Sequence, residues 1–563
     1  MDTNKKTHKV TLRKALVRAA LSLLVAVPLP LMLLISVPFE VYAANYQEYM
    51  FALSDFFPVL IGFFFLFTFV ISAAIFFLPK RAFRIVSAVL ISFALMCFVQ
   101  GNYLNGDMNT VGGDHIGDGV ETGTAVLNLV IWVVVIAAAV VLACLKDRKN
   151  IISYVAGVLA IVLLMTQIVA PIFVAVSNEE MFTAAADKKQ DFESGDHYDI
   201  LTDKNLHTAS TQGNVYWFIV DRFDESFALQ AYEDDPDLFD GMEGFTWFQN
   251  HLARYNHTYP AVCEMLTNNP FYPDMWRWMW LRASWENPVP LNLMNELGYG
   301  INLYTEWMYS FDYAGSLPDY VENLTPSNTY AISDKVGLAM SVVEVGLYRD
   351  FPHYLKSVID VNSSTSNEFV EVVDNEGNTQ YSSVKSYDSD FSTREGKGFY
   401  FIHTVGCHDD SSPKDGAADA IREIKQINRY LDYLKKQGLY DDATIIITGD
   451  HGISHNYFEE PSLTALFVKS SGTGSGSLRI SYAPTSHVNL WATVFKSEGI
   501  ATEQDYGLSV FEIAEDSQHE RYITSHTWGN PLTCVTYKVV GDARDFNNWV
   551  VLHELHFDKS LMD

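Results

Sequence analysis

Residues 439–452 read LYDDATIIITGDHG. In this stretch a strand-like run is followed directly by an acid and a histidine, two side chains that can take part in chemistry. Residues 444–448 are all β-branched, which is typical of a strand buried in a sheet. The glycines that follow let the backbone turn sharply, and Asp450 beside His451 offers oxygen and nitrogen ligands for a divalent transition metal. An ordinary polar turn is the competing interpretation, and the rest of the chain has to decide between the two.

Two other stretches end in the same way. Residues 214–220, NVYWFIV, indicate a strand that ends at Asp221, and YFIHTVGCHDD at 400–410 indicates another strand with a turn after it. Helix-like and strand-like segments alternate around them, which favours an α/β sandwich with a largely parallel sheet. Ligands of such sheets bind beyond the carboxyl ends of the strands, so we expect Asp221 and Asp450 at one edge.

The 400–410 stretch carries two histidines, His403 and His408, on either side of a glycine. Core packing explains such a pair poorly. The two imidazoles could ligate a metal, or they could bind a phosphoryl oxygen and protonate a leaving group, and the sequence leaves both roles open. Asp409 and Asp410 follow directly and are compatible with a simple turn cap.

Thr258 stands two residues before Pro260 in NHTYPAVCEMLT at 256–267. If Pro260 opens a helix in its first turn, Thr258 lies at or near the N-terminus, where backbone N–H groups and the helix dipole favour an anion. A hydroxyl group there could be deprotonated by a metal and attack phosphorus or sulfur. A plain N-cap threonine is the alternative, and the triplet at 256–258 also matches an N-glycosylation acceptor.

The first third of the chain is strongly apolar. Most of its apolar stretches are long enough to cross a bilayer core of ~30 Å, and the third is the shortest. They lie at 15–37, 57–78, 85–99, 126–145 and 151–176. Lys and Arg gather at the N-terminus and in the loops 80–84 and 146–149, whereas the alternate loops carry only acids. The positive-inside rule then places the N-terminus in the cytoplasm and everything after residue 176 outside, with the first stretch retained as an anchor.

The remaining residues are acidic. The first 177 residues hold 12 basic and 9 acidic side chains, and the other 386 hold 26 and 59, a formal charge of −33 for that part. Such a surface argues against nucleic acid as a partner, because phosphate binding needs a basic footprint. The sequence thus predicts a multi-pass plasma membrane protein with a transmembrane helical domain (1–177), a linker (178–212), an extracytoplasmic catalytic domain (213–515) and a strand-rich closing segment (516–563). A cluster of tryptophans over 276–285 receives no specific role.

These motifs resemble those of a known group of enzymes. Asp221, Thr258, HTVGCH at 403–408, GDHG at 449–452 and TSHVNLWATVFKSEG at 485–499 occur in the order seen in the alkaline phosphatase and sulfatase superfamily. The resemblance covers roughly residues 212–515. With five apolar spans ahead of it, this arrangement is similar to that of the membrane-anchored lipoteichoic acid synthases and phosphoethanolamine transferases.

The resemblance implies a metal site and a covalent mechanism. It implies that Asp221, Thr258, Asp450 and His451 bind a divalent metal, zinc or manganese, and that Thr258 forms a phospho-enzyme. It further implies that the two histidines, His403 and His408, contact the phosphate or a second metal.

The chain also departs from the pattern of its relatives. Cys-dependent sulfatases need Cys or Ser where this chain has Thr258, and Arg where it has Val262, so formylglycine chemistry is not expected. The transferases usually have Glu at the first ligand position, where this chain has Asp221. Asp409 and Asp410 replace a glycine and a proline that follow the histidine segment in phosphoethanolamine transferases.

The expected function is transfer of a phospho-headgroup, of the phosphoethanolamine or phosphoglycerol type, from a membrane phospholipid to a cell-surface glycan or lipid. Two alternatives stay open. One is a surface phosphodiesterase, phosphatase or sulfatase-like ester hydrolase with the same chemistry, and the other is a catalytically silent membrane scaffold. The sequence leaves the transferred group, the acceptor and the oligomeric state undetermined.

Overall fold

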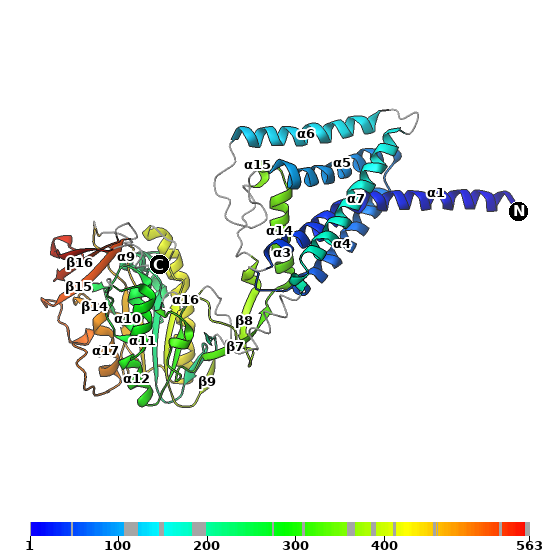
Figure 1. Ribbon diagram of the computed structural model, residues 1–563. Coiled ribbons are helices and arrows are strands. Elements are labelled where there is room, and N and C mark those ends of the chain that lie inside the picture. The colour runs from blue at the N-terminus through cyan, green and yellow to red at the C-terminus, as the bar shows by residue number, and fades with distance from the viewer. Residues whose placement is uncertain are drawn as a thin grey trace. The chain divides into compact units, whose positions relative to one another are not determined.

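A computed structural model of the chain describes most of its residues. The described ranges are 2–46, 49–105, 122–145, 151–182, 199–272, 275–306, 310–356, 366–383, 390–408, 412–453, 458, 460–527 and 532–557. The chain forms two compact units (Figure 1). The helical unit comprises Met1–Asp196 and Asn328–Val372, and the sheet unit comprises His197–Ser327 and Val373–Asp563.

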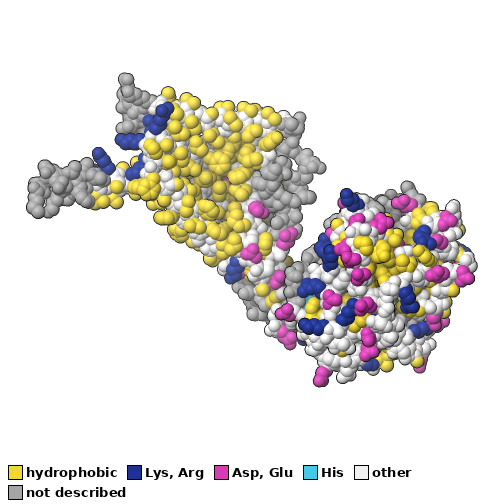
Figure 2. Space-filling model, turned by 180° about the vertical axis from the view of Figure 1, so that it is seen from behind, with side chains coloured by type: hydrophobic (Ala, Val, Ile, Leu, Met, Phe, Trp, Pro, Cys, Tyr) yellow, Lys and Arg dark blue, Asp and Glu magenta, His cyan; other side chains and the backbone are white. Residues whose placement is uncertain are grey.

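The helical unit contains five helical segments, among the described residues, that are long and apolar enough to cross a membrane. They are Leu12–Asn45, Leu53–Phe76, Lys80–Leu104, Gly123–Cys144 and Val155–Ser177. Their helices are α1 (Asp2–Ala26), α2 (Pro28–Leu31), the π-helical η1 (Met32–Ser36), α3 (Val37–Asn45), α4 (Leu53–Phe76), α5 (Lys80–Val99), the π-helical η2 (Gln100–Leu104), α6 (Thr122–Cys144) and α7 (Ile151–Ser177). Apolar side chains cover the visible face of this unit (Figure 2).

The third span is longer than the sequence pattern indicates. The apolar run covers 85–99, but the helix begins at Lys80, and η2 extends it to Leu104. Gln100 is fully buried and accepts hydrogen bonds from Asn128 and Trp132 of α6. Hydropathy ends the span too early because these polar side chains satisfy one another inside the helical unit.

A segment distant in sequence completes the helical unit. Residues 328–372, which the sequence places in the catalytic domain, carry α14 (Lys335–Asp350) and α15 (His353–Lys356). One face of α14 packs into the apolar core that α3 and α4 help to form. Gly346 permits the close approach, since a Cβ there would lie 2.6 Å from Cγ1 of Val37, and Arg349 Nη1 donates to Glu40 Oε2 at 2.9 Å. The domain limits read from the sequence remain a prediction.

The described part of the sheet unit is built on a seven-stranded mixed sheet, in the order β13-β4-β12-β11-β3-β10-β6. Its strands are β3 (Asn214–Val220), β4 (Thr246–Phe248), β6 (Tyr299–Tyr304), β10 (Lys397–Thr404), β11 (Ala443–Thr448), β12 (Leu466–Lys469) and β13 (Arg479–Ser481). The four strands β11, β3, β10 and β6 are parallel to one another, whereas β12 is antiparallel to both β11 and β4. The predicted α/β sandwich behind five apolar helices is therefore confirmed.

Both faces of this sheet are covered, which explains why β3 is buried along its whole length. Val215, Trp217 and Ile219 pack on one face with residues of α10 (Thr258–Thr267), α11 (Arg277–Trp285), α12 (Val289–Glu296) and α17 (Leu490–Ser497). Tyr216 and Phe218 point the other way, into a core shared with α9 (Glu225–Asp234) and α16 (Pro413–Gln437). The strand thus reads as a continuous apolar run rather than an alternating one.

Short strands complete the unit. β1 (Asp199–Leu201) pairs with β7 (Leu324–Ile332), and the same sheet contains β8 (Val370–Asp374). β2 (Thr208–Ser210) pairs with β9 (Ser392–Arg394). β5 (His251–Leu252) pairs with β14 (Thr485–Ser486). After α17, β15 (Glu520–Thr527), β16 (Leu532–Val540) and β17 (Trp549–Phe557) form an antiparallel sheet. We call these three strands the C-terminal sheet.

Candidate functional site

Three neighbouring parallel strands deliver the predicted site residues to one edge of the sheet. β3 lies between β10 and β11, and Ile219 of β3 is level with His403 on one side and Thr448 on the other. Asp221 follows the end of β3, and Asp450 follows the end of β11 after a single glycine. Because the strands run parallel, their polar ends meet at one place.

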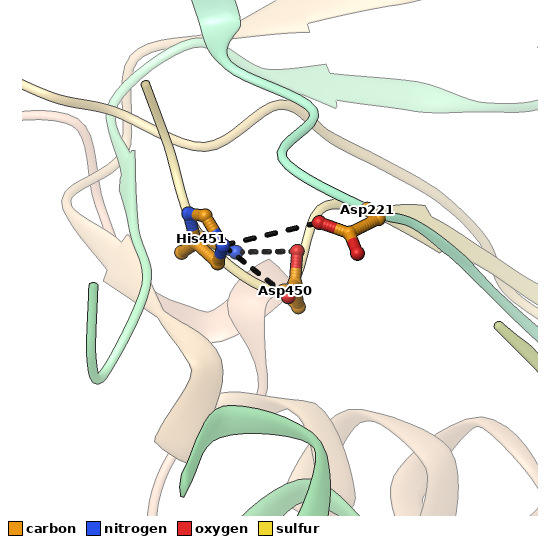
Figure 3. Close-up of side chains that lie close together, drawn as sticks. All are labelled: Asp221, Asp450 and His451. Carbon is orange, nitrogen blue, oxygen red and sulfur yellow. Dashed lines mark hydrogen bonds and ion pairs between the residues drawn. The ribbon is translucent and has the colours of Figure 1, made fainter. Parts of the chain in front are cut away.

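Asp221, Asp450 and His451 converge there, and all three are buried (Figure 3). Nε2 of His451 lies 3.9 Å from Oδ1 of Asp221 and 3.6 Å from Oδ2 of Asp450. One ligand atom from each residue lies within 4.8 Å of the others. This spacing is longer than a hydrogen bond and suits three ligands around one cation.

The tautomer of His451 supports a metal site. Its Nδ1 lies 2.7 Å from the carbonyl oxygen of Gly452, and a carbonyl only accepts, so Nδ1 carries the proton. Nε2 is therefore the nitrogen that can bind a cation, and it faces two carboxylate oxygens. A histidine ligand oriented by a backbone carbonyl is the usual arrangement at metal centres. The three donors therefore fit a divalent cation.

Asp450 is the most heavily supported member of the cluster. Its Oδ1 accepts the backbone N–H groups of Arg222 at 2.8 Å and of His451 at 2.9 Å. Burial alone would raise the pKa of Asp450, but nearby His451 and His403, the Arg222 N–H and a hydrogen bond from the Thr258 hydroxyl outweigh burial and lower it. The side chain is thus held as a carboxylate although it is fully buried.

The two glycines of GDHG are required by close contacts. A Cβ on Gly449 would lie 2.8 Å from the backbone N of Phe223, and one on Gly452 would lie 2.4 Å from Oγ of Ser462. Gly406, between the two histidines, has a φ of +56° and would place a Cβ 2.5 Å from the backbone of Asp221. The loop after β10 therefore packs directly on the first ligand.

Thr258 joins the cluster from a different element. It is the first residue of α10, it is buried, and its hydroxyl lies close enough to Asp450 to help lower the pKa of that carboxyl. The hydroxyl thus lies at the positive end of a helix dipole, which favours negative charge on its oxygen. The expected helix start at Thr258 is therefore present, and its roles as nucleophile and ligand stay predictions.

The two histidines of the 403–408 segment occupy different surroundings. His403 is buried, and its Nε2 lies 3.7 Å from Oδ2 of Asp221. Burial lowers the pKa of His403, although Asp450 and Glu306 oppose that shift. His408 is exposed, and its carbonyl accepts a hydrogen bond from Arg222. Asp409 and Asp410 lie outside the described residues.

The tryptophan cluster divides between core and surface. Trp280 and Trp285 are buried in the core on the α10 side of the sheet, whereas Trp276 and Trp278 are exposed. The structure therefore accounts for two of the four by packing.

Several residues of the site carried no signal that sequence reasoning used. Arg222 has a φ of +55°, and its guanidinium donates to the carbonyl oxygens of His408 and Ile453, which ties two site loops together. His487 lies in the TSHVNLW stretch and donates from Nε2 to the carbonyl of Gly449 at 3.1 Å. His526, in the C-terminal sheet, is fully buried beside His451, and burial lowers its pKa to about 3.

A family model of the sulfatases matches residues 214–500, which is just over half of the chain. The chain belongs to the sulfatase family. The matched residues include Asp221, Thr258, Asp450 and His451, and the chain is an enzyme of the alkaline phosphatase superfamily. The C-terminal sheet lies beyond the matched part of this sulfatase-family chain.

Solved structures give distant similarities. Phosphonate monoester hydrolase SpPMH from Silicibacter pomeroyi is 15% identical, with 62% of this chain and 89% of that chain covered and a TM-score of 0.35. Lipoteichoic acid synthase LtaP from Listeria monocytogenes is 12% identical, with 65% and 90% covered and a TM-score of 0.33. A comparison with curated proteins finds no match. At these scores the assignment to the sulfatase family rests on the family model.

The metal site leads to a first prediction. Asp450→Asn keeps the size of the side chain but removes its charge, so we expect the metal content of the detergent-purified protein to fall at least about tenfold. Elemental analysis for zinc and manganese measures this. Asp374→Asn is the matched control, because Asp374 is also buried but caps a turn through Glu376 and Asn378. Equal metal content in wild type and Asp450→Asn would contradict the site.

His487 gives a prediction about pH. Burial lowers its pKa to about 4, below the ~6.5 of an unfolded chain. The unfolded state therefore binds more protons between these values, and the free energy of unfolding should fall as the pH falls, by up to about 1.4 kcal/mol per pH unit. We expect His487→Gln to flatten the drop in urea midpoint between pH 6.5 and 5. The exposed His553→Gln should leave it unchanged, and equal slopes in all three proteins would contradict the assignment.

Proposed function

We propose that the chain transfers a phospho-headgroup, of the phosphoethanolamine or phosphoglycerol type, from a membrane phospholipid to a cell-surface glycan or lipid through a covalent phospho-threonine at Thr258. One observation carries this proposal. The Thr258 hydroxyl lies beside the Asp450 carboxylate, in a buried cluster of metal-binding character, at the N-terminus of α10.

The nucleophile distinguishes this chain from Cys-dependent sulfatases. Thr258 and Val262 stand where formylglycine chemistry needs Cys or Ser and Arg, and both are buried. A threonine at a helix N-terminus can instead attack phosphorus directly. The five apolar helices of the same chain would hold such a nucleophile near lipid donors.

Each residue of the site has a separate role in the proposed reaction. A divalent cation held by Asp221, Asp450 and His451, zinc or manganese, would lower the pKa of the Thr258 hydroxyl and offset charge on the phosphoryl oxygens. Thr258 Oγ then attacks phosphorus and the ester bond to the lipid alcohol breaks. A histidine of the 403–408 segment, His403 or His408, would protonate the departing alcohol.

The fate of the phospho-threonine separates transfer from hydrolysis. Release by a second hydroxyl group makes the protein a transferase, whereas release by water makes it a phosphodiesterase or phosphatase. Transfer to a membrane-borne or glycan hydroxyl is favoured here by the apolar helices in the same chain. A silent scaffold is dropped, since the chain is an enzyme.

Thr258 leads to a direct test. We expect Thr258→Ala to abolish both turnover of labelled phospholipids and the mass adduct on the peptide that contains residue 258, while the unfolding temperature changes by only a few degrees. Thr267→Ala is the matched control, because Thr267 lies in the same helix and donates only to Cys263. Turnover at the wild-type level in Thr258→Ala would sink the proposal, and an adduct that water alone removes would identify a hydrolase.

We further propose a cytoplasmic N-terminus and an extracytoplasmic sheet unit, from the basic loops between alternate spans. A cysteine at exposed Asp516 should react with a membrane-impermeant thiol reagent in intact cells, and one at exposed Arg81 only after permeabilisation. Cys144→Ser provides the background, because Cys144 is exposed and the other four cysteines are buried. The reverse labelling pattern would invert the topology.

A further inference from the structure

The C-terminal sheet reaches the residues that lead into the nucleophile. Thr524 of β15 donates its N–H to the carbonyl of Arg254 at 2.9 Å, and Tyr255 pairs with Thr524 in parallel fashion. Tyr255 therefore forms an isolated bridge to β15, and the segment 254–257 lies beside this strand. The segment ends directly before Thr258, so its position sets the position of the helix start.

Asn256 fastens this segment to β15 with its side chain. Its Oδ1 accepts the backbone N–H of His526 at 3.0 Å, and its Nδ2 donates to the carbonyl of His526 at 3.3 Å and to Oγ of Ser525 at 3.2 Å. The amide is 2% exposed, so these bonds are shielded from water. In the folded chain this amide is therefore not exposed as a glycosylation acceptor.

The imidazole ring of His526 makes a second set of contacts with the residues around Thr258. The imidazoles of His526 and His257 stack with centroids 3.9 Å apart and an interplanar angle of 27°. His257 is the N-cap of α10, and the ring of Tyr259 meets His526 at 5.5 Å. Both neighbours of Thr258 in the chain thus contact the same residue of the C-terminal sheet.

We propose that Asn256 and His526 are positioning residues for Thr258, and that the C-terminal sheet is therefore part of the active site. This inference rests on the proposed role of Thr258. The hydrogen bonds of Asn256 hold the backbone two residues before Thr258. The stack of His526 on His257 holds the N-cap residue, which lies between Asn256 and Thr258. A displacement of the hydroxyl by 1 Å is enough to cost about 10²-fold in rate.

The test compares two buried asparagines that both bind the C-terminal part of the chain. Asn256 bonds β15 two residues before Thr258, whereas Asn250 lies earlier in the chain and bonds Gly541, Ala543 and Arg521. In the full-length protein, with bis(p-nitrophenyl) phosphate and saturating Mn²⁺, we expect Asn256→Ala to lower kcat about 10²-fold and to change KM less than about threefold. Asn250→Ala should lower the unfolding temperature but keep the kcat of the folded fraction within about threefold.

A readout that does not depend on turnover is the affinity for Mn²⁺, measured by calorimetry. Loss of a residue that supports a ligand costs about 10- to 100-fold in metal affinity, so Asn256→Ala should raise the Kd by about tenfold and Asn250→Ala should not. Rescue tests the ring: His526→Phe keeps an aromatic stack on His257 and should retain most of kcat, whereas His526→Ala should lose it.

The outcomes separate the two proposals. A wild type without turnover would overturn the proposed function, and the Mn²⁺ affinities would still decide the role of Asn256. An active wild type in which both asparagine variants keep their kcat and their Kd would overturn the inference. So would equal losses in the two variants, because the sheet would then contribute stability alone.

Discussion

The carboxylate of Asp450 is the group on which the rest of the site depends. It is fully buried, and a buried carboxylate is costly unless N–H groups, hydroxyl groups or cations surround it. Here the N–H donors come from two separate elements, the loop after β3 and the turn after β11, and the Thr258 hydroxyl at the start of α10 lies close by. Each element must be in place before the charge is satisfied, so the fold around the sheet edge is specified by one side chain.

Much of this arrangement could be predicted from local sequence, for a physical reason. Asp221, Asp450 and His451 stand directly after apolar strands, and parallel strands place such positions at one edge whatever the order of the strands between them. Thr258 was recognisable because a proline two residues later marks a helix start. These signals all lie within a few residues of the group that they identify.

The features that sequence reasoning missed are those that depend on distant partners. Arg222 adopts a left-handed conformation because its N–H and its guanidinium bond to loops that are nearly 190 and 230 residues away. His526 lies in no motif, and only its stack on His257 shows a link to the site. Likewise, α14 reads as an ordinary amphipathic helix, and nothing in its own residues shows that Gly346 approaches Val37 so closely.

The partner of Asn256 lies 270 residues further along the chain. A chain that is synthesised from its N-terminus therefore acquires the candidate metal ligands well before it acquires β15. During that interval the segment before Thr258 lacks its neighbouring strand, and the amide of Asn256 has none of its three final partners. The proposed role of Asn256 therefore has a consequence for synthesis: Thr258 is correctly positioned only in chains in which β15 has already been made and has folded onto the segment before Thr258.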